Sequence, residues 1–205
     1  MTPKRAALLA AALAAAGLAA AVVFVVLALG DGSGEAYRGS RPPGRFLLPE
    51  FALRNHDGGR VRSTELRGKA LVVTFLESRC RESCPVIAAR VGRALRLLSP
   101  EERRRVVSLA ISTHPGDDTP ASVRGFLRRH RAENELLYLI GSERELRPVW
   151  KAFQILAALD TGDADVHSAG VRVYDRQSVW VSTLHAGVDL TAENLRHDLL
   201  AALAE

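Results

Sequence analysis

The sequence predicts an α/β fold in which a mixed central sheet is flanked by helices. Strand-like apolar runs alternate with helix-like stretches, which favours a mostly parallel sheet covered on both faces. The last two strand-like runs are separated by only four residues, 175–178, and so predict an antiparallel hairpin late in the chain. Hydrophobic residues make up 47% of the 205 residues, which is enough for a core and argues against disorder.

The early part of the chain predicts a hairpin, a central strand and a helix. The runs at 51–54 and 60–63 flank a turn rich in Asp and Gly, which is typical of a hairpin. Residues 70–76 are a continuous β-branched and aromatic run, which indicates a buried strand. The stretch 85–98 is apolar at helical spacing and opens with Pro85, a residue tolerated at the first helical position.

The later part continues the alternation and ends on a helix. The expected elements are a strand at 106–111, a helix at 120–130, a strand at 136–140, a helix at 142–153, a hairpin of 171–174 and 179–182, and a last helix that Thr191 caps and that runs to about Leu203. A central strand that delivers a cysteine pair to a helix start, with a late hairpin, is the arrangement of a thioredoxin-like fold. The hairpin at 51–63 would be an N-terminal addition to it.

An apolar segment near the N-terminus predicts a membrane anchor. Residues 6–29 hold 24 positions without a charged or strongly polar side chain. A spanning helix needs about 20, and a signal-peptide core usually has about 7–15. Basic residues precede the segment and acidic residues follow it, which places the rest of the chain on the extracytoplasmic side of the cell membrane. We therefore expect a single-pass anchor at 1–30, with a cleaved signal peptide as the alternative.

The remaining organisation and the charge follow from composition. Residues 31–45 are rich in Gly, Ser and Pro and are expected to form a flexible linker to a domain at 46–205. The net charge is +5, but the basic residues are spread along the chain and aromatic residues are only 5%. Nucleic-acid binding requires basic residues clustered with aromatic ones, so we expect no nucleic-acid partner.

Cys80 and Cys84 are the only cysteines, which excludes a disulfide-dense scaffold. They lie where the central strand should give way to a helix, whose dipole favours thiolate. Two thiolates on one ion suit copper(I). A structural disulfide would constrain only a short loop. A thiol–disulfide catalyst usually has two residues between its cysteines rather than three. These alternatives stay open beside the metal site.

One histidine is placed to complete a site. His167 lies in the polar loop 161–168, directly before a hairpin strand. In a thioredoxin-like fold that loop lies beside the cysteine loop, so His167 is the candidate third ligand. His114 follows a buried strand at the same end of the sheet and is a candidate fourth ligand. Three other histidines are expected to be solvated, namely His56, His130 and His197.

These features resemble the Sco/SenC family of membrane-anchored copper chaperones over about residues 46–203. The residues that carry the resemblance are Phe51-Ala52-Leu53, Asp57-Gly58, Leu66-Arg67-Gly68-Lys69, Val73-Thr74-Phe75, Cys80, Cys84-Pro85, Ile111-Ser112, Pro115, Asp118-Thr119-Pro120, Val149-Trp150-Lys151-Ala152-Phe153 and His167-Ser168. The resemblance implies that Cys80, Cys84 and His167 bind copper, as Cu(I) and as Cu(II). It also implies a chaperone rather than an enzyme. The partner would be the copper-bearing subunit of cytochrome c oxidase, at its dinuclear copper centre, or another copper chaperone.

The sequence departs from the family pattern at several positions around the cysteines. Arg81 replaces the usual proline, Glu77-Ser78 replaces an aromatic–threonine pair, and His114 replaces an aspartate. Gln177-Ser178 replaces a proline–glycine turn in the late hairpin. The three ligand positions are retained. Other functions for the same residues are a thiol–disulfide oxidoreductase that keeps client cysteines reduced, a peroxidase of related fold, and a zinc site.

Overall fold

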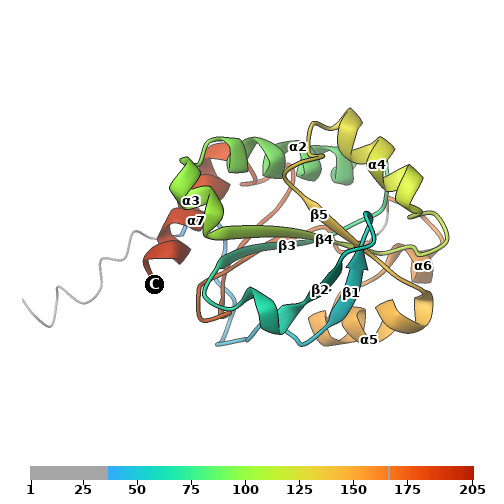
Figure 1. The fold of residues 1–205 in the computed structure, drawn as a ribbon, viewed down its shortest axis with the longest axis horizontal. Coiled ribbons are helices and arrows are strands. Elements are labelled where there is room, and N and C mark those ends of the chain that lie inside the picture. The colour runs from blue at the N-terminus through green and yellow to red at the C-terminus, as the bar shows by residue number, and fades with distance from the viewer. Residues whose placement is uncertain (1–36, 166) are drawn as a thin grey trace, which may run out of the picture. The chain divides into compact units, whose positions relative to one another are not determined.

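The computed structural model describes residues 37–165 and 167–205. A seven-stranded mixed sheet has the order β2-β1-β5-β4-β3-β6-β7 (Figure 1). The strands are β1 (Ala52–Asn55), β2 (Arg60–Arg62), β3 (Ala70–Leu76), β4 (Val106–Ser112), β5 (Leu137–Ile140), β6 (Val171–Tyr174) and β7 (Trp180–Leu184). The helices are α2 (Ser83–Arg96), α3 (Pro100–Arg104), α4 (Pro120–Arg129), α5 (Glu143–Phe153), α6 (Ala158–Thr161) and α7 (Ala192–Ala204), with a 3-10 helix η1 (Ser63–Leu66).

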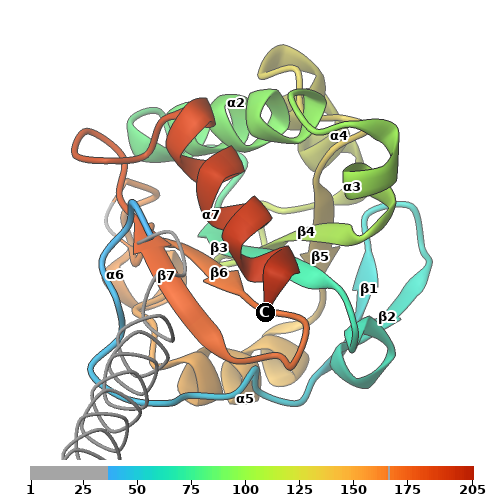
Figure 2. The same ribbon diagram turned by 90° about the vertical axis from the view of Figure 1, so that its left-hand side faces the viewer.

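Strand β3 lies in the interior of the sheet and all seven of its residues are buried. It pairs in parallel with β4, so that Leu76 lies opposite Ser112, and antiparallel with β6. Helices α2, α4 and α7 cover one face of the sheet, and α5 covers the other (Figures 1 and 2). This two-sided cover explains why β3 is a continuous apolar run instead of an alternating one. The expected mixed sheet with flanking helices is confirmed.

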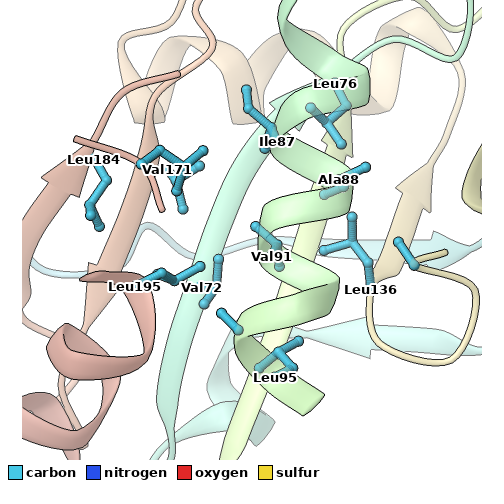
Figure 3. Packing of buried hydrophobic residues seen from close by; sticks show 14 of the residues in the cluster. Val72, Leu76, Ile87, Ala88, Val91, Leu95, Leu136, Val171, Leu184 and Leu195 are labelled. Atoms are coloured by element: carbon cyan, nitrogen blue, oxygen red, sulfur yellow. The ribbon is translucent and has the colours of Figure 1, made fainter. Parts of the chain in front are cut away.

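Successive residues of β3 belong to different hydrophobic clusters because side chains alternate across a strand. Val72 packs in the cluster under α2 and α7, whereas Val73 packs in the cluster under α5. Figure 3 shows α2 presenting Ile87, Val91 and Leu95 to the first cluster. Full burial of each such side chain contributes about 1.5–3 kcal/mol. The packing fixes α2, and therefore its first turn, against the central strand.

Several helices begin at the capping residues that the sequence indicates, but two short helices were not predicted. Thr119 and Thr191 cap α4 and α7, and Ser142 forms a capping box with Glu145 before α5. The unpredicted helices, α3 and α6, have only five and four residues, too few for periodicity to be read. Helix α2 begins at Ser83 rather than Pro85.

The chain before β1 lies along β7 (Figure 2). Ser40 pairs with Thr183, and Leu47 pairs with Val179, as isolated antiparallel bridges. Residues 37–45, expected as part of the linker, therefore contact the sheet. The expected anchor at 1–30 lies outside the described residues. Within 37–165 and 167–205, no helix is both long and apolar enough to span a bilayer.

The expectation that His56 is solvated is wrong. Its side chain is only 4% exposed, because the chain after β1 continues beside β5 and the His56 amide donates to the Tyr138 carbonyl. The strand-like run around it was visible in the sequence, but its pairing with β5 was not. His130 and His197 are half-buried rather than fully solvated.

Candidate metal centre

The two cysteines lie where β3 leaves the sheet and α2 begins. Cys80 precedes the helix, and Cys84 lies within its first turn. Both are free thiols, with exposed fractions of 4% and 0%. The backbone amide of Cys84 donates to the Cys80 sulfur at 3.3 Å. The helix start therefore holds both sulfurs on one side of the loop and directs an amide N–H at one of them.

His167 reaches the cysteines from the loop before β6. Its Nε2 atom lies 3.1 Å from the Cys84 sulfur, and its Nδ1 atom lies 3.1 Å from the carbonyl oxygen of Ser168. A proton on Nδ1 would be donated to that carbonyl, which leaves the lone pair of Nε2 directed at the sulfurs. The ligand atoms of Cys80, Cys84 and His167 all lie within 4.8 Å of one another. The structure thus brings together the three residues that the sequence analysis singled out.

The electrostatics of the two thiols are unequal. The hydrogen bond with the Cys84 thiol, helped by His167 and by the Cys84 amide, lowers the pKa of Cys80 to about 5 against the opposing effect of burial. Burial and the neighbouring Cys80 sulfur raise the pKa of Cys84. Burial alone would lower the pKa of His167, but its interactions with Cys80 and the Ser168 carbonyl leave that pKa raised. The two shifts favour the thiolate form at Cys80 and the protonated thiol at Cys84.

Asp165 joins the histidine loop to the cysteine loop. Its Oδ1 atom accepts hydrogen bonds from the amides of Arg81 at 2.7 Å and Glu82 at 3.1 Å. Both amides precede the first residue of α2, so the carboxylate joins the histidine loop to the segment that leads into the helix. Asp165 was not among the residues predicted for the site. Its only sequence signal was its place in the polar loop that carries His167.

The buried carboxylate of Asp118 is hydrogen-bonded to the start of the cysteine loop. Asp118 accepts hydrogen bonds from the Ser78 amide at 2.8 Å, the Ser112 hydroxyl at 2.7 Å and the Tyr138 hydroxyl at 2.9 Å. Burial raises the pKa of Asp118, although these hydrogen bonds act in the opposite direction. The chain ends of β3 and β4 and the strand β5 are joined through this one side chain. In the sequence, Asp118 stood out only as part of the motif Asp118-Thr119-Pro120.

His114 lies in a different group from the two sulfurs. Its Nδ1 atom is 3.2 Å from the Oδ2 atom of Asp117, and its ligand atoms cluster with those of Asp117 and Glu77. The structure therefore does not place His114 as a fourth ligand beside the cysteines. Burial, followed by the charges of Asp118 and Asp117, raises the pKa of Glu77 to about 7.

A surface cavity gives access to the cysteine loop. Cys80 is the cysteine that lines it, together with Arg79, Arg81, Arg129 and His130. The side chains of the three arginines are exposed. One sulfur therefore faces a positively charged opening, whereas Cys84 lies behind it with no exposed surface.

The fold and the site define a thioredoxin-like domain whose central strand delivers two free thiols to an imidazole. Comparison with known families agrees with this class. The chain matches the SCO1/SenC family over residues 40–203 and belongs to that family. The family resemblance read from the sequence is confirmed.

Individual relatives are distant in sequence. Protein sco1 of Schizosaccharomyces pombe is 25% identical over 105 residues, which are 51% of this chain and 39% of that protein. The match therefore spans less than half the length of that relative. Among solved structures, apo Sco1 from Thermus thermophilus has a TM-score of 0.67 at 21% identity, covering 83% of this chain and 99% of that chain. Bradyrhizobium japonicum ScoI with copper bound has a TM-score of 0.65 at 26% identity, covering 77% of this chain and 100% of that chain.

Proposed function

We propose that this chain is a copper chaperone that binds copper through Cys80, Cys84 and His167. The observation that carries the proposal is the convergence of two sulfurs and one imidazole nitrogen within 4.8 Å. Membership of the SCO1/SenC family supports it, and so does the similarity to a Bradyrhizobium japonicum structure that is described with copper bound. A soft donor set of this kind suits Cu(I), and the imidazole allows Cu(II) to bind as well.

Loading requires little rearrangement of the protein. The Cys80 sulfur is already the anionic partner of the pair, and Cys84 loses its proton when the cation arrives. The amide of Cys84 holds the Cys80 sulfur in place, and the carboxylate of Asp165 joins the histidine loop to the cysteine loop. Copper then leaves by ligand exchange, in which a thiolate of the client replaces one ligand at a time.

The delivery partner we propose is the copper-bearing subunit of cytochrome c oxidase, at its dinuclear copper centre, or another copper chaperone. The arginines around the opening beside Cys80 favour a client with an acidic surface. We further propose that residues 1–30 hold the domain at the extracytoplasmic side of the cell membrane. The apolar run at 6–29 and the charges that flank it support this tether.

Anaerobic Cu(I) titration of the full-length chain tests the proposed site. We expect one Cu(I) per chain, and an affinity that falls about 10–100-fold or more in His167→Ala. The exposed His185, in the loop after β7, provides a matched control, and His185→Ala should bind as the parent does. In the Cu(II)-loaded chain, sulfur-to-copper charge transfer should appear in the absorption spectrum. Unchanged binding in the double variant Cys80→Ser, His167→Ala would overturn the proposal.

A second candidate is a thiol–disulfide oxidoreductase, which the closeness of two free thiols favours. In that reaction the Cys80 thiolate attacks a client disulfide and one client thiolate leaves. Cys84 then loses its proton and attacks the Cys80 sulfur of the mixed disulfide. The second client thiolate leaves, and two electrons have passed to the client as a Cys80–Cys84 disulfide forms. Reductase activity should survive His167→Ala, whereas copper affinity should not, so this variant separates the two functions.

A further inference from the structure

A second group of ligating side chains lies at the same edge of the sheet as the cysteines. Glu77 follows β3 directly, and His114 and Asp117 lie in the loop after β4. Because β3 and β4 are parallel and Leu76 lies opposite Ser112, the two loops leave the sheet side by side. One ligand atom from each of the three residues lies within 4.8 Å of the other two. None of these residues belongs to the proposed copper site.

The Glu77 side chain is the unusual member of this group. It is only 1% exposed, and among residues 37–165 and 167–205 its Oε2 atom has no hydrogen-bond partner. Buried carboxylate oxygens are normally paired or bound to a cation, because removing them from water is costly. The Glu77 carboxyl group combines an unpartnered buried oxygen with a ligand atom within 4.8 Å of an imidazole nitrogen and of a second carboxylate, which is a placement suited to binding a cation.

The other two residues connect this oxygen to solvent. The side chains of His114 and Asp117 are 26% and 24% exposed, and their facing atoms are 3.2 Å apart. The second oxygen of Asp117 accepts a hydrogen bond at 2.8 Å from Arg79, whose side chain is 69% exposed and free to turn outward. A cation can therefore enter past His114 and Asp117 and reach Glu77 at the inner end.

We propose that Glu77, His114 and Asp117 form a second metal site, selective for a divalent ion of the zinc type. Two carboxylates and one imidazole are a harder donor set than two thiolates, and they do not suit Cu(I). Three protein ligands leave a fourth position for water, as in open zinc sites. The inference goes beyond the proposed copper function.

The test distinguishes the two sites by their ligands, because the thiolates of the first prefer Cu(I) and the carboxylates of the second prefer Zn(II). The full-length chain is first loaded with one equivalent of Cu(I) under anaerobic conditions, then titrated with Zn(II), and both metals are counted after desalting. We expect one Zn(II) per copper-loaded chain. Binding should weaken at least tenfold in Glu77→Gln and in His114→Ala, while copper stays bound. His185→Ala is the matched control and should retain both metals.

A parallel titration removes any dependence on copper loading. In the double variant Cys80→Ser, Cys84→Ser, the soft site is gone, and Zn(II) should still bind with one ion per chain. Co(II) in place of Zn(II) should give weak d–d absorption without a sulfur charge-transfer band. Zn(II) binding that is absent from both forms, or that survives Glu77→Gln and Asp117→Asn at full affinity, overturns the second site.

Discussion

Asp118 and Asp198 are both buried carboxylates, with exposed fractions of 3% and 0%, yet they serve different parts of the molecule. Asp118 accepts hydrogen bonds from one backbone amide and two hydroxyls next to the cysteine loop. Asp198, on α7, accepts hydrogen bonds from the amides of Arg38 and Gly39 and from the hydroxyl of Ser182. The first holds the ends of three strands around the candidate site. The second fastens the chain before β1 to β7 and α7.

The donors explain what each position tolerates. A hydroxyl can turn and accept a hydrogen bond, whereas a backbone amide can only donate. Both hydroxyls that contact Asp118 approach the same oxygen, Oδ2, so an amide group placed there could donate to them. Each oxygen of Asp198 instead receives a backbone amide. The kind of donor, rather than the degree of burial, therefore decides whether an aspartate can be replaced by asparagine.

The largest effect is expected from Asp118→Ala. This change leaves the Ser78 amide and the hydroxyls of Ser112 and Tyr138 without their acceptor. Buried groups left unpaired cost about 1–3 kcal/mol each, so we expect the free energy of unfolding to fall by about 3 kcal/mol in urea denaturation. Because Ser78 leads into the cysteine loop, Cu(I) affinity should fall about tenfold. An unchanged affinity would show that the loop holds its shape without this support.

A smaller effect, confined to stability, is expected from Asp198→Asn. The new NH₂ group must face a backbone amide, either that of Arg38 or that of Gly39. We expect the free energy of unfolding to fall by about 2 kcal/mol, with Cu(I) affinity unchanged. Asp118→Asn is the matched control and should cost less than about 1 kcal/mol. Equal losses in the two asparagine variants would contradict the account based on donors.

The smallest effect on the fold is expected from Asp165→Ala. Asp165 accepts hydrogen bonds from the amides of Arg81 and Glu82. Water can bind these amides when the carboxylate is removed, so the midpoint of urea unfolding should not change. Cu(I) affinity should fall about tenfold, because the loop that carries His167 loses its link to the cysteine loop. Competition with a chromophoric Cu(I) chelator measures this. Glu82→Gln removes a charge from the same region, and an equal fall there would assign the effect to charge alone.

The sequence predicted those parts of the fold that depend on local patterns. The apolar run of β3 and the caps at Thr119 and Thr191 involve residues within one element. The short helix α6 and the burial of His56 depend on tertiary contacts that no local pattern contains, whereas α3 begins at a local capping box of Ser99 and Glu102 that was not recognised in the sequence. Even the two-residue shift in the start of α2 matters, because it places Cys84 in the first turn of the helix.

The residues of the candidate site also differ in how far local sequence patterns could predict them. The cysteine pair was visible from its spacing, and His167 could be proposed only through the expected fold. Asp165 was missed because its partners are backbone amides more than eighty positions away. Glu77 and His114 were seen as departures from a family pattern, but their convergence depends on the register between β3 and β4. Side chains that meet across strands cannot be found from either strand alone.

The distance along the chain between Cys84 and His167, 83 positions, couples occupancy to conformational stability. An unfolded chain keeps two sulfurs close together but loses the nitrogen, so it is a poorer ligand than the native chain. A ligand that prefers the native state stabilises it, by about 2.7 kcal/mol at a free concentration one hundred times the dissociation constant when the unfolded chain does not bind. The residual affinity of the two sulfurs reduces that figure. Release of the bound ion would therefore return the chain to its less stable form, and the thermal midpoint of unfolding would report the fraction of chains that hold the ion.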